Sequence, residues 1–226
     1  MLGRVLPETC VLCAGASTVG LSFCAPCFAT LPRIGASRCR VCALPLTSGE
    51  LCGRCTNHPP HYDGVRAPYA YVFPLDALIH AYKYRGDLSL APALAGALTD
   101  AGAPQVDALV PMPLSAARLR ERGFNQAQEL ARIVGRRLRL PVLSRACRKV
   151  KDTPPQAALE WSARKRNVRG AFVCDADLSG YRVAIVDDVM TTGATLDELA
   201  RVIKRAGAVE VQGWVVARTL RGTLAR

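Results

Sequence analysis

The chain has 226 residues, of which 50% are hydrophobic, enough for one ordinary domain with a substantial core and one small module. Its 30 Lys and Arg against 18 Asp and Glu give a formal net charge of +12, which favours polyanionic partners such as nucleic acid or phosphorylated small molecules. Residues 1–7 lack the apolar stretch of a signal peptide and no apolar run approaches transmembrane length, so we expect a cytoplasmic protein without membrane insertion.

Cysteines dominate the first 57 residues, where eight of the ten in the chain form four Cys-x-x-Cys pairs: Cys10 with Cys13, Cys24 with Cys27, Cys39 with Cys42, and Cys52 with Cys55. One such turn places two thiolates on a Zn²⁺ ion, and two turns complete a tetrahedral site. A reducing compartment argues against disulfides. We therefore predict a double zinc ribbon at residues 1–57 with two structural Zn²⁺ ions bound by sequential pairs. A cross-braced order, first pair with third and second with fourth, is the alternative.

The histidines and prolines of residues 57–61 are typical of a linker, so we expect a second domain at residues 62–226. Its first segment is rich in tyrosine and predicts a strand at Tyr69–Phe73 and a helix at Leu75–Tyr84, which we interpret as a small hood over the main domain. Lys83 in this helix could reach a phosphate, although a basic helix end ordinarily compensates only the helix dipole. Exposed tyrosines could also stack on nucleobases.

The next elements are typical of an open α/β sheet. A helix rich in Ala and Leu is expected at Leu88–Ala101 and a strand at Val106–Val110. The strand leads into a rigid turn made by Pro111, Met112, Pro113 and Leu114. Because ligands bind at the carboxyl ends of the strands in such sheets, this turn is a candidate binding loop.

Residues 118–169 carry fifteen Lys and Arg but four Asp and Glu, so half of the 30 basic residues lie in this part of the chain. Arginines of residues 118–128 could bind pyrophosphate oxygens in a bidentate manner, or could simply be solvated helix ends. After a weak strand near residues 141–146, a long polar connection that contains Lys151, Arg164 and Lys165 predicts a mobile lid. The charge excess also predicts a patch that binds single-stranded DNA.

Residues 183–195 carry the most specific pattern in the chain. Val183–Val186 predict a strand buried on both faces, and Asp187 and Asp188 follow where that strand should end. An amphipathic helix should begin after a loop made by Thr191, Thr192, Gly193, Ala194 and Thr195. The N–H groups of such a loop and the dipole of the helix favour a phosphate. Thr195 and Glu198 also fit a capping box, in which Thr195 would only cap the helix.

The pattern of residues 183–195 resembles the phosphoribosyl-pyrophosphate (PRPP) signature of type I phosphoribosyltransferases. Over nearly the whole chain, the order of motifs resembles the ComF family (competence protein F): two zinc ribbons, YKYRGD at 82–87, VPMPL at 110–114, RLRERGFNQ at 118–126, and then the PRPP signature. The resemblance implies an α/β fold with a type I phosphoribosyltransferase-like parallel sheet and a small hood, preceded by a small zinc-ribbon domain. It also implies a cytoplasmic protein with a part in DNA uptake during natural transformation.

The same resemblance implies roles for single residues. Asp187 and Asp188 would hold the ribose hydroxyls of PRPP, and Thr191–Thr195 would hold its 5-phosphate. Mg²⁺ would accompany PRPP and neutralise the pyrophosphate, which backbone groups of Pro111–Leu114 would bind. Lys83 and Arg164 complete the predicted catalytic set, with Arg164 on the lid that excludes water.

Three functions remain open from the sequence. The chain could be a phosphoribosyltransferase with a nitrogenous acceptor, although residues 218–226, which we predict to be a basic tail, offer no specific acceptor-binding loop. It could be a PRPP-binding protein of DNA uptake that also binds single-stranded DNA, which is the interpretation we favour. The zinc ribbons could instead be an adaptor that docks a helicase-like partner.

Overall fold

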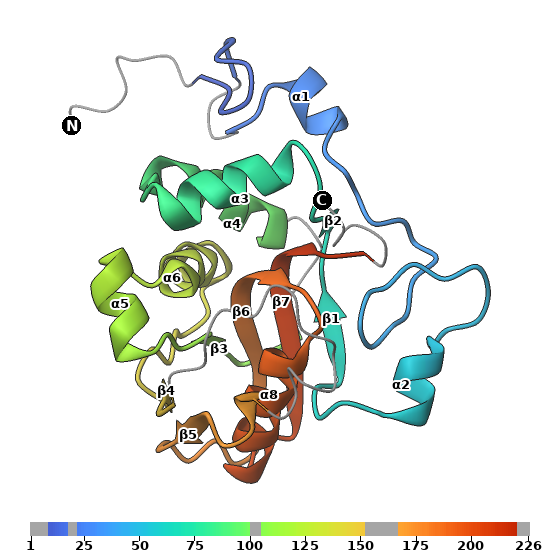
Figure 1. Cartoon of the computed structure of the whole chain (residues 1–226), viewed down its shortest axis with the longest axis vertical. Coiled ribbons are helices and arrows are strands. Elements are labelled where there is room, and N and C mark those ends of the chain that lie inside the picture. Colours follow the sequence, from blue (N-terminus) through green and yellow to red (C-terminus); the bar gives the residue numbers. More distant parts are fainter. Residues whose placement is uncertain (1–8, 18–21, 100–104, 152–166, 221–226) are drawn as a thin grey trace.

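The computed structural model describes residues 9–17, 22–99, 105–151 and 167–220. Its centre is a five-stranded parallel sheet, in which β6 pairs with β3 on one side and with β7 on the other (Figure 1). Two short strands, β1 and β2, follow one another along the outer edge of β7. The strands are β1 (Gly64–Arg66), β2 (Tyr69–Ala70), β3 (Ala108–Pro111), β6 (Arg182–Met190) and β7 (Glu210–Arg218).

Helices cover both faces of this sheet because side chains of β6 alternate between two apolar layers. Ala184 and Val186 pack with α3, α4 and α6, whereas Val183 and Ile185 pack with α8. A short 3₁₀ helix, η1, precedes α4. The bounds are α3 (Leu75–Tyr84), η1 (Leu88–Leu90), α4 (Ala91–Thr99), α6 (Gln126–Leu138) and α8 (Ala194–Arg205).

The described part of the basic segment, residues 118–169, contains helices α5 and α6 and the strand β4. Helix α5 (Ala116–Arg122) ends at Gly123, whose φ of 78° reverses the chain, and Asn125 caps the start of α6. Beyond α6, β4 (Cys147–Lys149) pairs antiparallel with β5 (Phe172–Cys174). Within the described ranges, no helix combines the length and the apolar character needed to cross a membrane.

The cysteine-rich part of the chain packs against the sheet domain through a shared core. It contains the short helices α1 (Ala25–Ala29) and α2 (Gly53–Asn57). Phe23 and Leu31 join the apolar layer of α3 and α4, whereas Ile34 and Leu44 join the layer of α8. The two parts are also linked through the backbone, because the Ile34 N–H donates to the Pro68 carbonyl at 2.9 Å.

The structure confirms the predicted fold class and refines several element bounds. The weak strand near 141–146 is a single parallel bridge between Val142 and Leu109. The strand expected at Tyr69–Phe73 ends at Ala70, because the chain turns there and the Leu75 N–H bonds to the Val72 carbonyl. Within the aromatic segment, α3 lies over the carboxyl end of the sheet, while β1 and β2 join the sheet edge itself.

Candidate functional site

A tight loop joins the end of β6 to the start of α8, and we define residues 190–193 as the phosphate loop. Gly193 is the N-cap of α8 with a φ of 82°, a conformation that other L-residues rarely adopt. A Cβ on Gly193 would lie 2.4 Å from Met190 Cε and 3.1 Å from the Tyr62 hydroxyl, so a side chain there would displace Met190 in addition to straining the backbone. The loop therefore brings backbone close to the positive end of the α8 dipole, which is an anion-binding arrangement.

Thr195 is not the cap of α8, so the capping-box reading is wrong. Gly193 occupies that position, and no side chain caps the helix. The Glu198 carboxylate, which a capping box would direct to the helix start, accepts the Gly170 N–H at 2.7 Å and pairs with Arg201. Thr195 lies inside the first turn, and the Ala194 N–H donates to the Thr192 hydroxyl at 3.4 Å.

The two aspartates lie within β6 and not after it, because the strand continues to Met190. Asp188 is 1% exposed, and its Oδ1 accepts from the Lys83 ammonium at 2.8 Å and from the Val189 N–H at 2.7 Å. Its Oδ2 is buried without a hydrogen-bond partner among the described residues. Asp187 is half-buried and accepts the Asp188 N–H at 2.9 Å. The structure thus joins Lys83 of α3 to the predicted carboxylates.

The charged groups of this cluster shift one another's pKa values. Burial, and then the negative charge of Asp188, raise the pKa of Asp187 to about 7 against the opposing charge of Lys83. Burial alone would lower the pKa of Lys83, but the charges of Asp188 and Asp187 outweigh it and raise that pKa. The cluster therefore holds a permanently charged lysine beside a carboxyl group that titrates near neutral pH.

The turn at Pro111–Leu114 lies at the same edge of the sheet, beside the end of β6. The Met112 N–H donates to the Val186 carbonyl at 2.9 Å, and the Asn125 side-chain amide donates to the Met112 carbonyl at 3.1 Å. Asn125 also caps α6, so one side chain fixes both the helix start and the turn. The sequence analysis did not single out Asn125, although an Asn just before an amphipathic helix is a recognisable N-cap signal.

Two arginines that the sequence analysis missed hold the phosphate loop from behind. Arg218, which we had assigned to a basic tail, is the last residue of β7 and is 2% exposed. Its guanidinium donates to the Met190 carbonyl at 3.0 Å, to the Thr191 carbonyl, and to the Cys42 carbonyl at 3.1 Å. Arg54 of α2 donates to the Thr192 carbonyl at 2.7 Å. These contacts join segments far apart in sequence, and no local pattern announces them.

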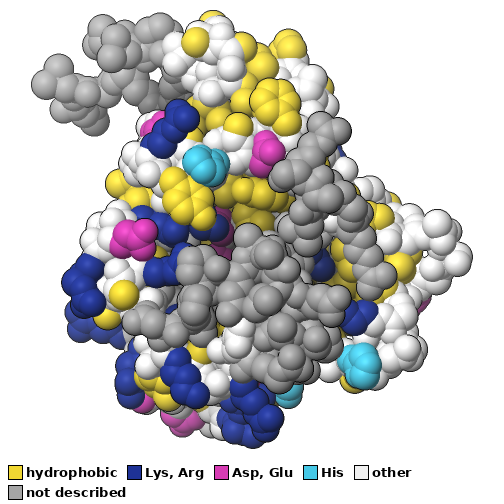
Figure 2. Space-filling model, in the orientation of Figure 1, with side chains coloured by type: hydrophobic (Ala, Val, Ile, Leu, Met, Phe, Trp, Pro, Cys, Tyr) yellow, Lys and Arg dark blue, Asp and Glu magenta, His cyan; other side chains and the backbone are white. Residues whose placement is uncertain are grey.

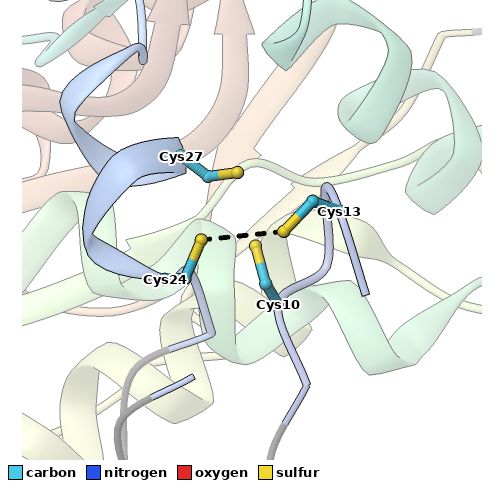
Figure 3. Close-up of side chains that lie close together, drawn as sticks. All are labelled: Cys10, Cys13, Cys24 and Cys27. Atoms are coloured by element: carbon cyan, nitrogen blue, oxygen red, sulfur yellow. Dashed lines mark hydrogen bonds between the residues drawn. The ribbon is translucent and has the colours of Figure 1, made fainter. Parts of the chain in front are cut away.

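The cysteines of the four predicted pairs form two clusters in sequential order: Cys10, Cys13, Cys24 and Cys27 in the first, and Cys39, Cys42, Cys52 and Cys55 in the second. In each, the sulfur atoms lie within 4.8 Å of one another, and those of the first cluster point to a common centre (Figure 3). A tetrahedral ion with Zn–S bonds of about 2.3 Å needs sulfurs about 3.8 Å apart. The Cys13–Cys24 and Cys42–Cys52 separations of 3.7 and 3.6 Å match it.

The chemistry of the thiols also fits a metal. Burial alone would raise the pKa of Cys10, but hydrogen bonds from backbone N–H groups, that of Cys24 first, lower it to about 6. Burial would likewise raise the pKa of Cys39, but hydrogen bonds from backbone N–H groups, that of Cys52 first, lower it to about 7. Each cluster therefore contains a thiol that ionises readily, and the thiolate is the form that binds Zn²⁺. Both clusters fit structural zinc.

Most of the predicted lid, including Arg164 and Lys165, lies outside the described residues. Lys151, at the edge of that segment, is exposed, and its ammonium donates to the Arg169 carbonyl at 3.4 Å. Cys147 and Cys174, which belong to neither cluster, face each other as partners in the β4–β5 register.

Comparisons with known proteins agree with these features. The model of the double zinc ribbon domain matches residues 1–56, and that of the phosphoribosyl transferase domain matches residues 120–226. The DNA utilization protein YhgH of Escherichia coli K12 is 34% identical over 225 residues, which cover 95% of this chain and 99% of that protein. Competence protein F of Haemophilus influenzae is 35% identical over 178 residues, 74% of this chain and 78% of that protein.

The chain belongs to the ComF family. Competence protein ComFC of Streptococcus pneumoniae is a more distant relative, 26% identical over 198 residues that cover 86% of this chain and 87% of the relative. The membership confirms the resemblance drawn from the order of the motifs. It also accounts for the combination seen here, in which a double zinc ribbon packs against a phosphoribosyltransferase-type sheet.

Proposed function

We propose that this ComF-family protein binds PRPP with Mg²⁺ at the carboxyl edge of its sheet and acts in DNA uptake. The main support for the proposal is that the phosphate loop and the buried Lys83–Asp188 ion pair lie together at the end of β6. The DNA role is supported by the relatives, which are named a DNA utilization protein and a competence protein. The phosphoribosyl transferase domain supports PRPP as the ligand.

Each part of PRPP has a complementary group in the proposed site. Backbone N–H groups of the phosphate loop bind the 5-phosphate at the N-terminus of α8. Asp187 and Asp188 accept hydrogen bonds from the ribose hydroxyls, with the half-buried Asp187 the more accessible of the two. The Lys83 ammonium positions Asp188 by donating to its Oδ1 at 2.8 Å, and the turn at Pro111–Leu114 offers backbone groups to the pyrophosphate.

Mg²⁺, when bound with PRPP, would neutralise the pyrophosphate, largely through phosphate oxygens and water. If phosphoribosyl transfer takes place, the ionised carboxylates would also stabilise the positive charge that develops on the ribose ring, as preorganised electrostatics do. The alternative function is an active phosphoribosyltransferase that transfers the phosphoribosyl group of PRPP to a nitrogenous acceptor. The N-terminal ribbons are a further surface on which a helicase-like partner could dock.

The proposal is tested by calorimetric titration of the full-length protein with PRPP and Mg²⁺. Ribose 5-phosphate and Mg²⁺-pyrophosphate, which each carry half of the ligand, serve as controls. We expect PRPP to bind more tightly than either control, since it alone engages the phosphate loop, the carboxylates and the turn together. The absence of PRPP binding, or affinity for pyrophosphate equal to that for PRPP, would refute the proposed site.

A second activity, binding of single-stranded DNA, is favoured by the basic surface. Figure 2 shows dark-blue side chains along the edge of the molecule formed by α5 and the β4–β5 pair. Exposed arginines lie on this part of the chain: Arg120 on α5, Arg132 and Arg136 on α6, Arg139 just after it, and Arg148 on β4. Arg132, Arg136 and Arg139 line an open hollow beside residues 140–142, together with Glu129, which pairs with Arg132 at 2.7 Å and leaves a net positive charge. A groove of this charge suits a phosphate backbone.

An exposed aromatic side chain near the proposed PRPP site adds the means to stack on a base. Tyr84, next to Lys83, is 63% exposed. The His80 ring lies 4.7 Å from its ring, and the Arg122 guanidinium lies 5.2 Å from its centroid. Base stacking on such a ring is worth about 1–3 kcal/mol and tolerates any sequence. Tyr84 thus supports the proposed contact with single-stranded DNA.

A further inference from the structure

The second cysteine cluster is connected to the phosphate loop through two guanidinium groups. We define the second ribbon as residues 39–55. Arg54 precedes the cluster ligand Cys55 on α2 and donates to the Thr192 carbonyl at 2.7 Å. Arg218 donates to the carbonyl of the ligand Cys42 at 3.1 Å and to the carbonyls of Met190 and Thr191. The Thr192 carbonyl therefore faces the ribbon, and the Met190 and Thr191 carbonyls face Arg218, which the ribbon contacts through the Cys42 carbonyl.

This orientation determines where the loop presents its donors. In a trans peptide unit the C=O and the following N–H point in opposite directions. Because the carbonyls of Met190, Thr191 and Thr192 accept from the two guanidinium groups, the N–H groups of Thr191, Thr192 and Gly193 point away from those groups. Successive N–H groups on one side of a turn form an anion-binding concavity. The two guanidinium charges behind the loop add positive potential to it.

The contact between ribbon and loop is closely packed. The remaining cavity beside Arg54, Tyr62, Thr192 and Gly193 has a volume of about 10 Å³, enough for about one water molecule. Tyr62 is 3% exposed, and burial raises its pKa, with the charge of Arg54 opposing the effect. Asp197 in the first turn of α8 lines the same cavity, and its carboxylate accepts the His61 N–H at 2.7 Å. A shift of the ribbon would therefore be transmitted to the loop.

We propose that the second ribbon is a positioning element of the phosphate loop, so that filling its cysteine cluster with Zn²⁺ sets the affinity for the 5-phosphate. This inference rests on the proposed PRPP site. Helix α2 has five residues and buries only Cys55, so it is too short to be stable without the metal cluster. When the cluster opens, Arg54 and the Cys42 carbonyl lose their fixed positions, so the Thr192 carbonyl loses its donor and Arg218, which still contacts Met190 and Thr191, loses an acceptor that positions it.

The first test is Arg54→Met, with Arg40→Met as its matched control. Arg40 lies on the same ribbon, carries the same charge, and faces Glu50 at 3.8 Å on the exposed side. Loss of one charged hydrogen bond should weaken binding of Mg²⁺-PRPP by about tenfold to a hundredfold in the Arg54 variant. The control should bind as the wild type does. Equal affinities for the two variants would overturn the inference.

The second test opens the metal cluster itself with Cys52→Ser, with Cys174→Ser as the control because Cys174 belongs to neither cluster. The Cys52 variant should lose about one Zn²⁺ per chain, bind PRPP more weakly, and show faster hydrogen exchange at residues 190–193. The Cys174 variant should match the wild type in all three. Unchanged exchange in the loop after zinc loss would refute the coupling. If the wild type does not bind PRPP, the proposed function is refuted. Hydrogen exchange at residues 190–193 would still show whether the zinc cluster and the phosphate loop are coupled.

Discussion

Replacement of Lys83 by Met tests whether the buried ion pair at the end of β6 organises the site. Asp188 is 1% exposed and accepts from the Lys83 ammonium at 2.8 Å. The Coulomb attraction at this distance is about 6 kcal/mol at an effective dielectric constant of about 20. Desolvation offsets much of it, but removal of one partner leaves an uncompensated buried charge and costs about 3–5 kcal/mol. That is a large part of a typical free energy of unfolding of about 5–15 kcal/mol.

The assay is a double-mutant cycle of Lys83→Met and Asp188→Asn, measured by urea unfolding with zinc present. The double variant carries neither charge, so it should be more stable than Lys83→Met, with a coupling energy of at least about 2 kcal/mol. Arg148→Met, which removes an exposed partner of Asp175 at the same N–O distance of 2.8 Å, should cost at most about 1 kcal/mol. Additive effects of Lys83→Met and Asp188→Asn, within about 0.5 kcal/mol, would refute the reasoning.

Three further predictions concern the metal, the pH dependence and the DNA. Purified protein should contain about two Zn²⁺ per chain, and metal analysis that finds none would contradict the cluster assignment. Because the free Asp187 carboxyl has a pKa of about 7, ribose binding must displace its proton at lower pH, so PRPP affinity should fall by up to about tenfold from pH 7 to pH 6. The unliganded protein should show the opposite sign, losing stability as the pH rises from about 4 to 7, and Asp187→Asn should remove both effects. The double variant Arg136→Ala with Arg139→Ala should bind single-stranded DNA more weakly, and its slope of log K against log salt should become shallower by about 0.7 per lost phosphate contact. Arg38→Ala with Arg40→Ala is the control. Equal slopes for the two variants would place the DNA site elsewhere.

The central strands and the phosphate loop could be predicted because their signals are local. Val183–Val186 form an apolar run, and an amphipathic helix follows a Gly-containing loop within ten residues. The helix Leu75–Tyr84 has the predicted bounds, since an apolar periodicity and Gly86 mark it. The cysteine spacing likewise predicted the two clusters. In each case, the residues that specify the element are its own neighbours in the chain.

The rest depends on contacts between distant residues. Strand β1 has three residues, and it becomes a strand only because β7 offers its edge. Arg54 and Thr192 are 138 positions apart, and Arg218 and Cys42 are 176 apart. From the sequence, Arg218 is predicted to begin a basic tail. Its burial depends on a ribbon and a loop that are distant in sequence and fold against it. No periodicity in the sequence encodes such a contact.

The most direct test of the central claim is a calorimetric titration of Mg²⁺-PRPP into three proteins. Asp187→Asn with Asp188→Asn removes both carboxylates while keeping their size. Asp175→Asn with Asp177→Asn, at exposed positions, is the matched control. Loss of charged hydrogen bonds to the ribose should weaken binding by about a hundredfold or more in the first variant only, with zinc content unchanged. Equal affinity of the wild type and the Asp187/Asp188 variant for PRPP would contradict the account.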